Sequence, residues 1–201
     1  MNQSDFNLII QNQHIESKII ASFERIAQIF RVLLWQESKK YSLSPIQIQI
    51  LIFLSTHTED KRKVTYLANE FNMTKATISD AIKSLEQKEL ITKNYIDNDI
   101  RSYIIQLTTK GKNIANKTSV FTQQLHEPLS KLNLNDKENL LLNMLNIISH
   151  SNKNGLISVQ RMCYTCSHFQ TNNKKHICKL LNKELKNTEL RLDCQEYKLK
   201  E

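Results

Sequence analysis

The chemistry that this sequence can support is concentrated near its end, where all four of its cysteines lie. They are Cys163, Cys166, Cys178 and Cys194, and their spacing is C-x2-C-x11-C-x15-C. A C-x2-C pair can place two thiolates on one ion, and two further thiolates complete a tetrahedral ligand set. The spacing therefore predicts a structural zinc site held by these four cysteines.

Three alternatives to zinc stay open from the residues alone. The same four thiolates can hold a [4Fe–4S] cluster, or they can be free or redox-active thiols. They can also be small buried hydrophobic side chains, although the segment around them has few large apolar residues. His168 and His176 flank the cysteines and are candidates to replace one ligand. A unit of about 46 residues seldom folds without a staple, so metal binding would supply folding free energy.

Positive charge is gathered in two blocks of the chain. Of the formal net charge of +8, residues 61–112 carry +4 and residues 156–201 carry another +4. A basic surface attracts nucleic acid, and a solvated charged surface is the alternative explanation. The charge thus permits a DNA-binding protein without proving one.

Composition excludes several classes of protein. The 201 residues include only two glycines and two prolines, which argues against a turn-rich β fold and against a Gly-rich phosphate loop. No apolar run approaches the roughly 18–20 residues that span a bilayer, and no secretory signal is read, so a cytoplasmic protein without a membrane partner is expected. No enzyme is expected either, because four cysteines close a zinc coordination sphere and no His-Glu metal motif is present.

The hydrophobic pattern of the first part of the chain predicts helices. Apolar residues recur at spacings of three and four over residues 15–33, which is typical of a long amphipathic helix. A second helix is expected to start at Ser44, with Pro45 at its first position and Gln47 completing a capping box. Its residues are mostly apolar, so it is expected to be deeply buried.

The middle of the chain has the layout of a helix-turn-helix followed by a hairpin. Two short helical patterns, over residues 66–71 and 78–85, are joined by a tight connection in which Thr74 is a candidate N-cap. The β-branched stretches Leu90–Ile96 and Tyr103–Leu107 then predict the two strands of a β-hairpin. The predicted fold class is mainly α with this one small sheet.

Two more helices are expected after the hairpin. One covers residues 114–129 and ends or kinks near Pro128, and the other starts at Asn135 with a capping box to Glu138. The second is apolar on more than one side through residues 140–148, so another surface must cover it. A partner subunit is a good candidate for that surface.

The residues within these elements resemble a known family. Residues 64–112 read VTYLANEFNMTKATISDAIKSLEQKELITKNYIDNDIRSYIIQLTTKGK, which is similar to the winged helix-turn-helix of the MarR family of bacterial transcription regulators. The matching positions are Leu67-Ala68, Ile78-Ser79, Leu85-Glu86, Leu90-Ile91, Asp99 with Arg101, and Leu107-Thr108 through Gly111. Three positions depart from the family pattern: Glu89 stands at a usual glycine, Ile100 at a frequent wing arginine and Asp80 at a common basic residue.

The resemblance covers about residues 10–150 and implies a function. It implies a winged helix-turn-helix homodimer that binds a pseudo-palindromic site in double-stranded DNA and regulates transcription. A repressor is expected, and an activator is the alternative. The domain organisation that follows is a dimerisation and DNA-binding domain over residues 1–150, with its winged helix core at about 45–112. A four-cysteine metal-binding module over residues 156–201 lies outside the resemblance.

The second helix of the motif is expected to read base edges in the major groove. Its buried face is defined by Ile78, Ile82 and Leu85, which leaves candidate DNA contacts on its other faces. These candidates are Lys75, Thr77, Ser79, Asp80 and Lys83, with Lys75 and Ser79 the best placed. For each residue taken alone, an ordinary solvated surface position is the alternative.

Two further basic sites flank the reading helix. Arg101 resembles the wing arginine of the family and would suit a narrow minor groove, whereas a salt bridge to Asp97 or Asp99 is the alternative. Lys63, with the two basic residues before it, precedes the first helix of the motif. It is a candidate phosphate contact or part of a solvated loop.

The sequence leaves open which chemical signal would control the binding of such a regulator to DNA. No cysteine precedes Cys163, so a redox or metal signal must be sensed by the C-terminal segment. A small aromatic effector would instead bind between the dimerisation helices and the winged domain. A protein-recruiting or thiol-redox module with secondary DNA binding is the alternative function, and a metal-dependent enzyme is disfavoured.

Overall fold

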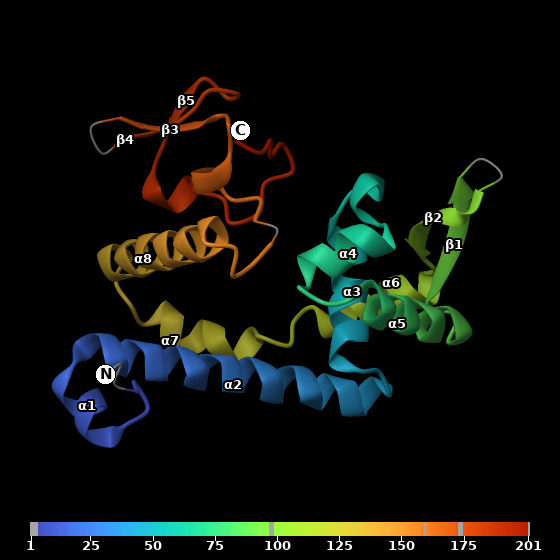
Figure 1. Ribbon diagram of the computed structural model, residues 1–201, viewed down its shortest axis with the longest axis horizontal. Helices are drawn as coiled ribbons and strands as arrows, with labels where there is room; N and C mark the ends of the chain where they lie inside the picture. Colours follow the sequence, from blue (N-terminus) through green and yellow to red (C-terminus); the bar gives the residue numbers. More distant parts are fainter. Residues whose placement is uncertain (1–3, 97–98, 159, 173–174, 201) are drawn as a thin grey trace.

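The computed structural model describes residues 4–96, 99–158, 160–172 and 175–200, and the side chains of 96–102 lie outside that description. The helices are α1 (Leu8–Gln13), α2 (Ile15–Tyr41), α3 (Pro45–Thr56), α4 (Val64–Glu70), α5 (Lys75–Gln87), α6 (Thr109–Thr118), α7 (His126–Ser130) and α8 (Leu134–Lys153). The strands are β1 (Ile91–Ile96), β2 (Asp99–Leu107), β3 (Phe169–Asn172), β4 (Lys175–Cys178) and β5 (Lys183–Leu185). Figure 1 shows α2 along one side of the molecule, the winged helix at one end, and α8 with the C-terminal strands at the other.

The predicted leading helix is confirmed as α2. It ends at Tyr41, where Ser42 adopts a left-handed conformation with φ of 53° and its N–H caps the carbonyl of Ser38. Although α2 buries Leu33 and Leu34, many apolar side chains of the N-terminal segment and α2 are exposed. These are Phe6, Leu8, Ile9, Ile15, Ile19, Ile20, Ile26, Ile29, Phe30, Val32 and Trp35. In the described part of the chain, no helix combines the length and apolarity needed to span a membrane.

The predicted capping box at the start of α3 is confirmed. The Ser44 hydroxyl accepts a hydrogen bond from the N–H of Gln47, and the Gln47 side-chain oxygen accepts one from the N–H of Ser44 at 2.9 Å. Pro45 occupies the first helical position, where its missing N–H costs nothing. As predicted, α3 is deeply buried, and it forms the centre of the larger hydrophobic cluster.

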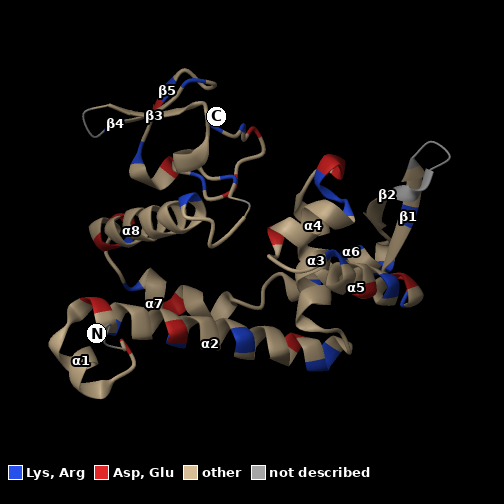
Figure 2. Cartoon of the chain, viewed as in Figure 1, with Lys and Arg blue, Asp and Glu red and all other residues tan. Residues whose placement is uncertain are grey.

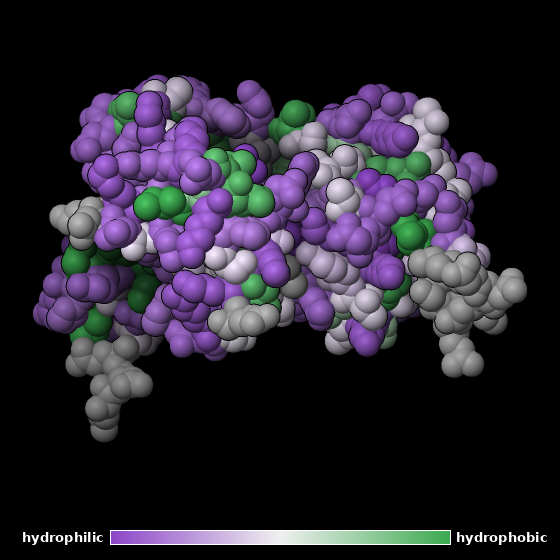
Figure 3. All heavy atoms as spheres, turned by 90° about the horizontal axis from the view of Figure 1, so that it is seen from above, coloured by the Kyte–Doolittle hydropathy of each residue, from purple (hydrophilic) through white to green (hydrophobic). Residues whose placement is uncertain are grey.

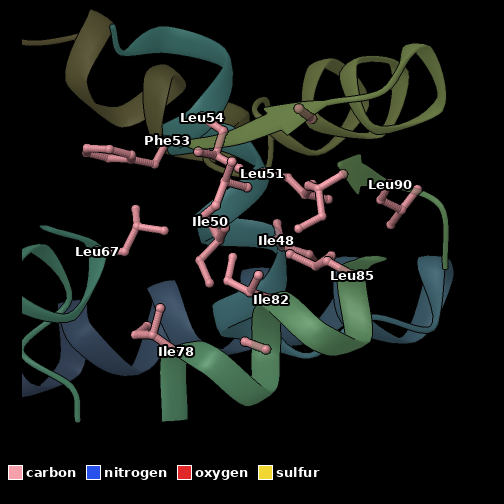
Figure 4. Close-up of a cluster of buried hydrophobic side chains, with 14 of the residues drawn as sticks. Ile48, Ile50, Leu51, Phe53, Leu54, Leu67, Ile78, Ile82, Leu85 and Leu90 are labelled. Carbon is pink, nitrogen blue, oxygen red and sulfur yellow. The ribbon is translucent and has the colours of Figure 1, made fainter. Parts of the chain in front are cut away.

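The predicted helix-turn-helix consists of α4 and α5, which pack on α3. Figure 4 shows the side chains of α4 and α5 directed at those of α3, the labelled residues being Leu67, Ile78, Ile82, Leu85, Ile48, Ile50, Leu51 and Leu54. All eight are fully buried. Thr74 caps α5 as predicted, because its hydroxyl accepts a hydrogen bond from the N–H of Thr77 at 3.1 Å.

The predicted hairpin is also present. β1 and β2 pair antiparallel from Ile91 opposite Leu107 to Ile96 opposite Asp99, with an irregular register between Tyr95 and Ile96. The second strand starts at Asp99 rather than at Tyr103, so the connection is shorter than predicted. Its two central residues, 97–98, lie outside the described residues.

The single helix predicted over residues 114–129 is wrong. α6 ends at Thr118, whose hydroxyl donates to the carbonyl oxygens of Ile114 and Ala115. Such bonding by a β-branched residue to its own helix weakens the helical path beyond it. The chain becomes helical again in α7, where Pro128 lies within the first turn and removes no helical hydrogen bond.

The predicted start of the last long helix is also corrected. α8 begins at Leu134, and its cap is Asn133 rather than Asn135. The Asn133 side chain accepts a hydrogen bond from the N–H of Asp136 at 2.9 Å, so the box to Glu138 does not form. Both asparagines have the chemistry of an N-cap, and only the backbone conformation at Asn133 decides between them.

The C-terminal tail, residues 156–200, contains a second sheet that the sequence analysis did not predict. β3, β4 and β5 form a three-stranded antiparallel sheet in that order. Strands of three or four residues are too short for an alternating pattern to stand out. The expectation of a single small sheet is therefore wrong.

The tail covers one side of α8. A second hydrophobic cluster joins Leu145 of α8 to residues of the tail, namely Met162, Cys166, Phe169, Leu185 and Leu190. One of the apolar sides of α8 is therefore covered by the tail of the same chain. Leu140 and Ile147 remain exposed, at 38% and 44%, so another apolar side of α8 is still open.

Replacing Gly111 with alanine should destabilise the winged helix. A Cβ at this position would overlap the backbone carbonyl of Leu90, which also accepts the N–H of Thr108, so the wing could not keep its place against α6. We expect a loss of at least about 2 kcal/mol in the free energy of unfolding, measured in urea. The exposed neighbour Lys112→Ala is the control, and an equal effect of both substitutions would contradict the packing argument.

Candidate nucleic-acid interface and cysteine cluster

Helix α5 is the helix predicted to read base edges and is called the reading helix below. Its candidate DNA contacts face the solvent. Lys75, Thr77, Ser79, Asp80 and Lys83 are all exposed, while Ile78, Ala81, Ile82 and Leu85 are buried against the core. The Thr77 hydroxyl lies 2.9 Å from the Thr74 hydroxyl, so part of its hydrogen-bonding capacity serves the helix cap. The other four side chains make no hydrogen bond within the described part of the chain.

The wing is fixed to the reading helix by an ion pair. Lys93 of β1 donates to Glu86 of α5 at 2.6 Å, and its ammonium lies 5.2 Å from the centre of the Tyr103 ring. The hydrogen bond to Glu86 raises the pKa of Lys93, which means that the ion pair stabilises the charged ammonium. The helix and the hairpin are therefore held as one surface, and Figure 2 shows basic residues on α5, on β1 and before α4.

The basic loop before α4 divides into two roles. Lys63 is exposed and stands at the N-cap position of α4. Arg62 instead donates through Nε and Nη2 to the carbonyl oxygen of His57, at 2.9 and 2.6 Å, so its guanidinium holds the end of α3. The side chain of Arg101, the predicted wing contact, lies outside the described residues.

The four cysteines, which are spread over residues 163–194, line one cavity. Its volume is about 300 Å³, and Cys163, Cys166, Cys178 and Cys194 share its wall with His168. His176 lies elsewhere, stacked on Phe169 with ring centres 5.5 Å apart. Among the described residues, no three His, Cys, Asp or Glu side chains are arranged closely enough to hold a metal ion.

Polar hydrogens of Arg191 point at two of the sulfurs. Its backbone N–H donates to Cys163 Sγ at 3.2 Å, and its Nη1 donates to Cys194 Sγ at 3.4 Å. Burial is the main reason that the pKa of the Cys163 thiol is raised, with the neighbouring cysteines adding to it and the Arg191 N–H opposing it. A cation in this cavity would reverse that balance, because it favours the thiolate.

A separate apolar cavity lies beside α2. Its volume is about 350 Å³, and its wall is formed by Phe30, Leu34 and Trp35 of α2, by the start of α3, and by Phe121. The position is between the long helix and the winged helix, where the sequence analysis expected a small aromatic effector. Phe30 and Phe121 meet edge to face with ring centres 6.3 Å apart.

An ion-pair network centred on the buried Arg161 connects the tail to the helix-turn-helix, and it was not predicted from the sequence. Arg161, only 5% exposed, contacts Glu70 of α4 and Asp193 of the tail at 2.6 Å each. Although burial opposes its charge, hydrogen bonds to Asp193 and Glu70 raise the pKa of Arg161. Burial likewise opposes ionisation of Asp193, but its hydrogen bonds with His57 and Arg161 lower its pKa. Asp193 and Glu70 are 32 and 91 residues away from Arg161 in the sequence, so no local spacing could have revealed these partners.

Part of the winged helix is similar to a known protein family. Residues 41–99 match the MarR family. This segment contains α3, α4, α5 and β1, which are the elements that place the reading helix. The search of curated proteins found no match.

Solved structures share the fold over about two thirds of the chain. The structure of S. aureus MepR in complex with DNA is 24% identical with a TM-score of 0.56, over 65% of this chain and 95% of MepR. MepR in its DNA-binding conformation gives 24% and 0.57, over 66% and 97%. The transcriptional regulator BldR from Sulfolobus solfataricus gives 26% and 0.51, over 68% and 99%. The MarR match and these similarities support a MarR-type winged helix, and about a third of this chain has no counterpart in them.

Proposed function

We propose that this chain is a transcriptional repressor that binds a pseudo-palindromic operator in double-stranded DNA as a homodimer. The exposed face of α5, capped at Thr74 and joined to the wing by Lys93 and Glu86, is the observation that carries the proposal. Lys75 and Ser79 lie at the start of this helix, where side chains reach base edges when a recognition helix enters the major groove. Lys83, Lys63 and Arg101 supply charge for phosphates and the minor groove. The proposed function is binding and includes no catalysed reaction.

Binding to DNA is tested by its salt dependence. The protein first selects a binding site from a pool of duplexes of random sequence. The selected duplex is then labelled and titrated with the protein at several salt concentrations, with fluorescence anisotropy as the readout. Each phosphate contacted contributes a slope of about −0.9 to the plot of log affinity against log salt. We expect a slope of several units and a preference for duplexes with two-fold symmetry. An affinity that does not fall with added salt would contradict the proposal.

The homodimer forms through the apolar surface that one chain leaves open. Ile15, Ile19 and Ile26 share one face of α2, at spacings of four and seven, and are between 43% and 64% exposed. The exposed Leu140 and Ile147 of α8 extend the apolar surface available to a partner. By contrast, the face of the molecule in Figure 3 is mainly hydrophilic, with only separate hydrophobic groups.

Ile26→Glu should weaken the dimer at least tenfold, because a charge would be buried without a partner. Sedimentation velocity at several concentrations measures the change. The control is Gln28→Glu, which adds the same charge on the polar face of α2 at almost unchanged size. If the protein sediments as a monomer before any substitution, the dimer proposal fails.

The cysteine cluster is proposed to bind one structural zinc ion through Cys163, Cys166, Cys178 and Cys194. Four thiols on one cavity are a suitable donor set, and the two hydrogen bonds from Arg191 stabilise sulfur in its charged form. A zinc ion held by all four sulfurs would join the segments of the tail that carry them. A [4Fe–4S] cluster on the same thiolates is the alternative. Elemental analysis and an absorption spectrum of anaerobically purified protein separate the two metals from metal-free thiols.

An effector site is proposed in the cavity beside α2. The aromatic rings of Phe30, Trp35 and Phe121 suit a small aromatic molecule, and Arg31 at the wall suits an acidic group on it. A ligand there would touch both the dimerisation helix and the start of α3. It could therefore change the spacing of the two reading helices and release DNA.

A further inference from the structure

Arg161 lies at the meeting point of the tail and the helix-turn-helix. Its Nη1 donates to Glu70 Oε2 at 2.6 Å, and Nη2 donates to Glu70 Oε1 at 3.2 Å. On its other side, Nε donates to Asp193 Oδ1 at 2.7 Å and Nη2 donates to Asp193 Oδ2 at 2.6 Å. Both carboxylates are thus held by paired bonds, a geometry that an arginine fork fits and a lysine cannot.

The guanidinium also sits on an aromatic platform from α3 and α4. Its central carbon is 5.6 Å from the Phe53 ring centre and 5.9 Å from that of Tyr66, and the Tyr66 hydroxyl accepts a hydrogen bond from Nη1 at 2.9 Å. His57 stacks on Phe53 at 3.7 Å and places Nε2 2.9 Å from Asp193 Oδ2. The rings and hydrogen bonds therefore fix the orientation of the Arg161 guanidinium, in addition to the carboxylates that balance its charge.

The network touches the turn that orients the reading helix. Glu70 is the last residue of α4, and Asn72, with φ of 49°, lies in the turn before α5. The Asn72 side-chain oxygen accepts hydrogen bonds from the hydroxyl and the N–H of Ser158, at 2.7 and 3.1 Å. Two tail residues thus hold the segment between α4 and α5.

The same network touches the cysteine cluster. Asp193 immediately precedes Cys194, whose N–H donates to the carbonyl of Arg161 at 2.9 Å. Arg161 in turn lies two residues before Cys163, whose N–H donates to the carbonyl of Arg191 at 3.0 Å. A change in how the sulfurs are held must therefore move the backbone that carries Arg161 and Asp193.

We propose that Arg161 is a positioning residue that couples the occupancy of the cysteine site to the α4–α5 turn, so that the metal-loaded tail holds the reading helix ready for DNA. This inference rests on the proposed DNA and zinc binding. When zinc is lost, the small tail loses its staple, so the hold of Arg161 on Glu70 weakens. The α4–α5 turn is then less restrained, and affinity for DNA falls.

The coupling is measured as a ratio of two affinities of the full-length protein. Dissociation constants for the selected duplex are determined with zinc bound and after zinc removal by EDTA. Because coupling between two sites typically amounts to 5- to 150-fold in affinity, we expect metal removal to weaken DNA binding at least about 5-fold. Hydrogen exchange at the amides of residues 70–74 should rise in parallel.

Arg161→Met keeps the aliphatic bulk and removes the fork. It should retain about one zinc ion per chain and still bind DNA, but metal removal should now change its DNA affinity less than 2-fold. Arg161→Lys should recover only part of the coupling. Glu70→Gln, which breaks the network from the side of α4, is the second variant if Arg161→Met does not fold. Lys175→Met is the control, because Lys175 makes an exposed ion pair with Glu184 in the same tail and, among the described residues, no contact with the network.

The possible failures are distinguishable. Wild-type protein that binds both zinc and DNA but shows less than a 2-fold change on metal removal would overturn the coupling and leave the proposed function intact. Full coupling in both Arg161→Met and Glu70→Gln would overturn the role of the network. Protein that binds no zinc or no DNA would overturn the proposed function and this inference together.

Discussion

Cys163→Ser is expected to lower the bound metal from about one ion per chain to near zero. Serine is a poor ligand for zinc, and the remaining three thiolates leave the coordination sphere open. Since the apolar cluster of the tail is small, the loss of metal should also expose the tail to proteolysis between α8 and the C-terminus. Elemental analysis and limited proteolysis of anaerobically purified protein measure both effects.

The matched control for this substitution is His168→Ala. His168 lines the same cavity as the cysteines, so its loss leaves the metal bound only if all four ligands are thiolates. Unchanged metal content in Cys163→Ser would reject the four-thiolate site. If the wild-type protein is coloured and contains iron, the four cysteines bind a [4Fe–4S] cluster instead of zinc. If it contains no metal, the cysteines are free thiols.

Lys83→Glu should weaken binding to the selected duplex by about tenfold or more. Lys83 is exposed on α5, and in the proposed orientation a reversed charge there would repel the phosphates. The slope of log affinity against log salt should decrease by about one unit as a phosphate contact is lost. Fluorescence anisotropy over a series of salt concentrations gives both quantities.

The control for Lys83→Glu is Lys131→Glu. Lys131 is the residue that follows α7, outside the winged helix, and within the described residues its side chain pairs with the exposed Glu127 alone. Both substitutions change the net charge of the chain equally, so they separate a local contact from a general charge effect. If both weaken DNA binding to the same extent, α5 does not carry the contact that we propose.

Local rules of sequence predicted the winged helix well. The capping box at Ser44, the cap at Thr74 and the buried face of α5 depend on residues within four positions of one another. Such short-range patterns are visible in the sequence because helix geometry fixes which side chains meet. The start of α8 shows the limit of this approach, because Asn133 and Asn135 are chemically equivalent candidates.

The sequence by itself determined the helical class, the helix-turn-helix with its wing and the location of the four cysteines. Only the tertiary structure decided that the tail forms a sheet, covers α8 and is joined to α4 through Arg161. The physical reason is sequence distance. Arg161 is held by Glu70 and Asp193, and no local pattern around Arg161 marks its charge as buried. A buried ion pair depends on what packs around it, and that is decided only when distant segments come together.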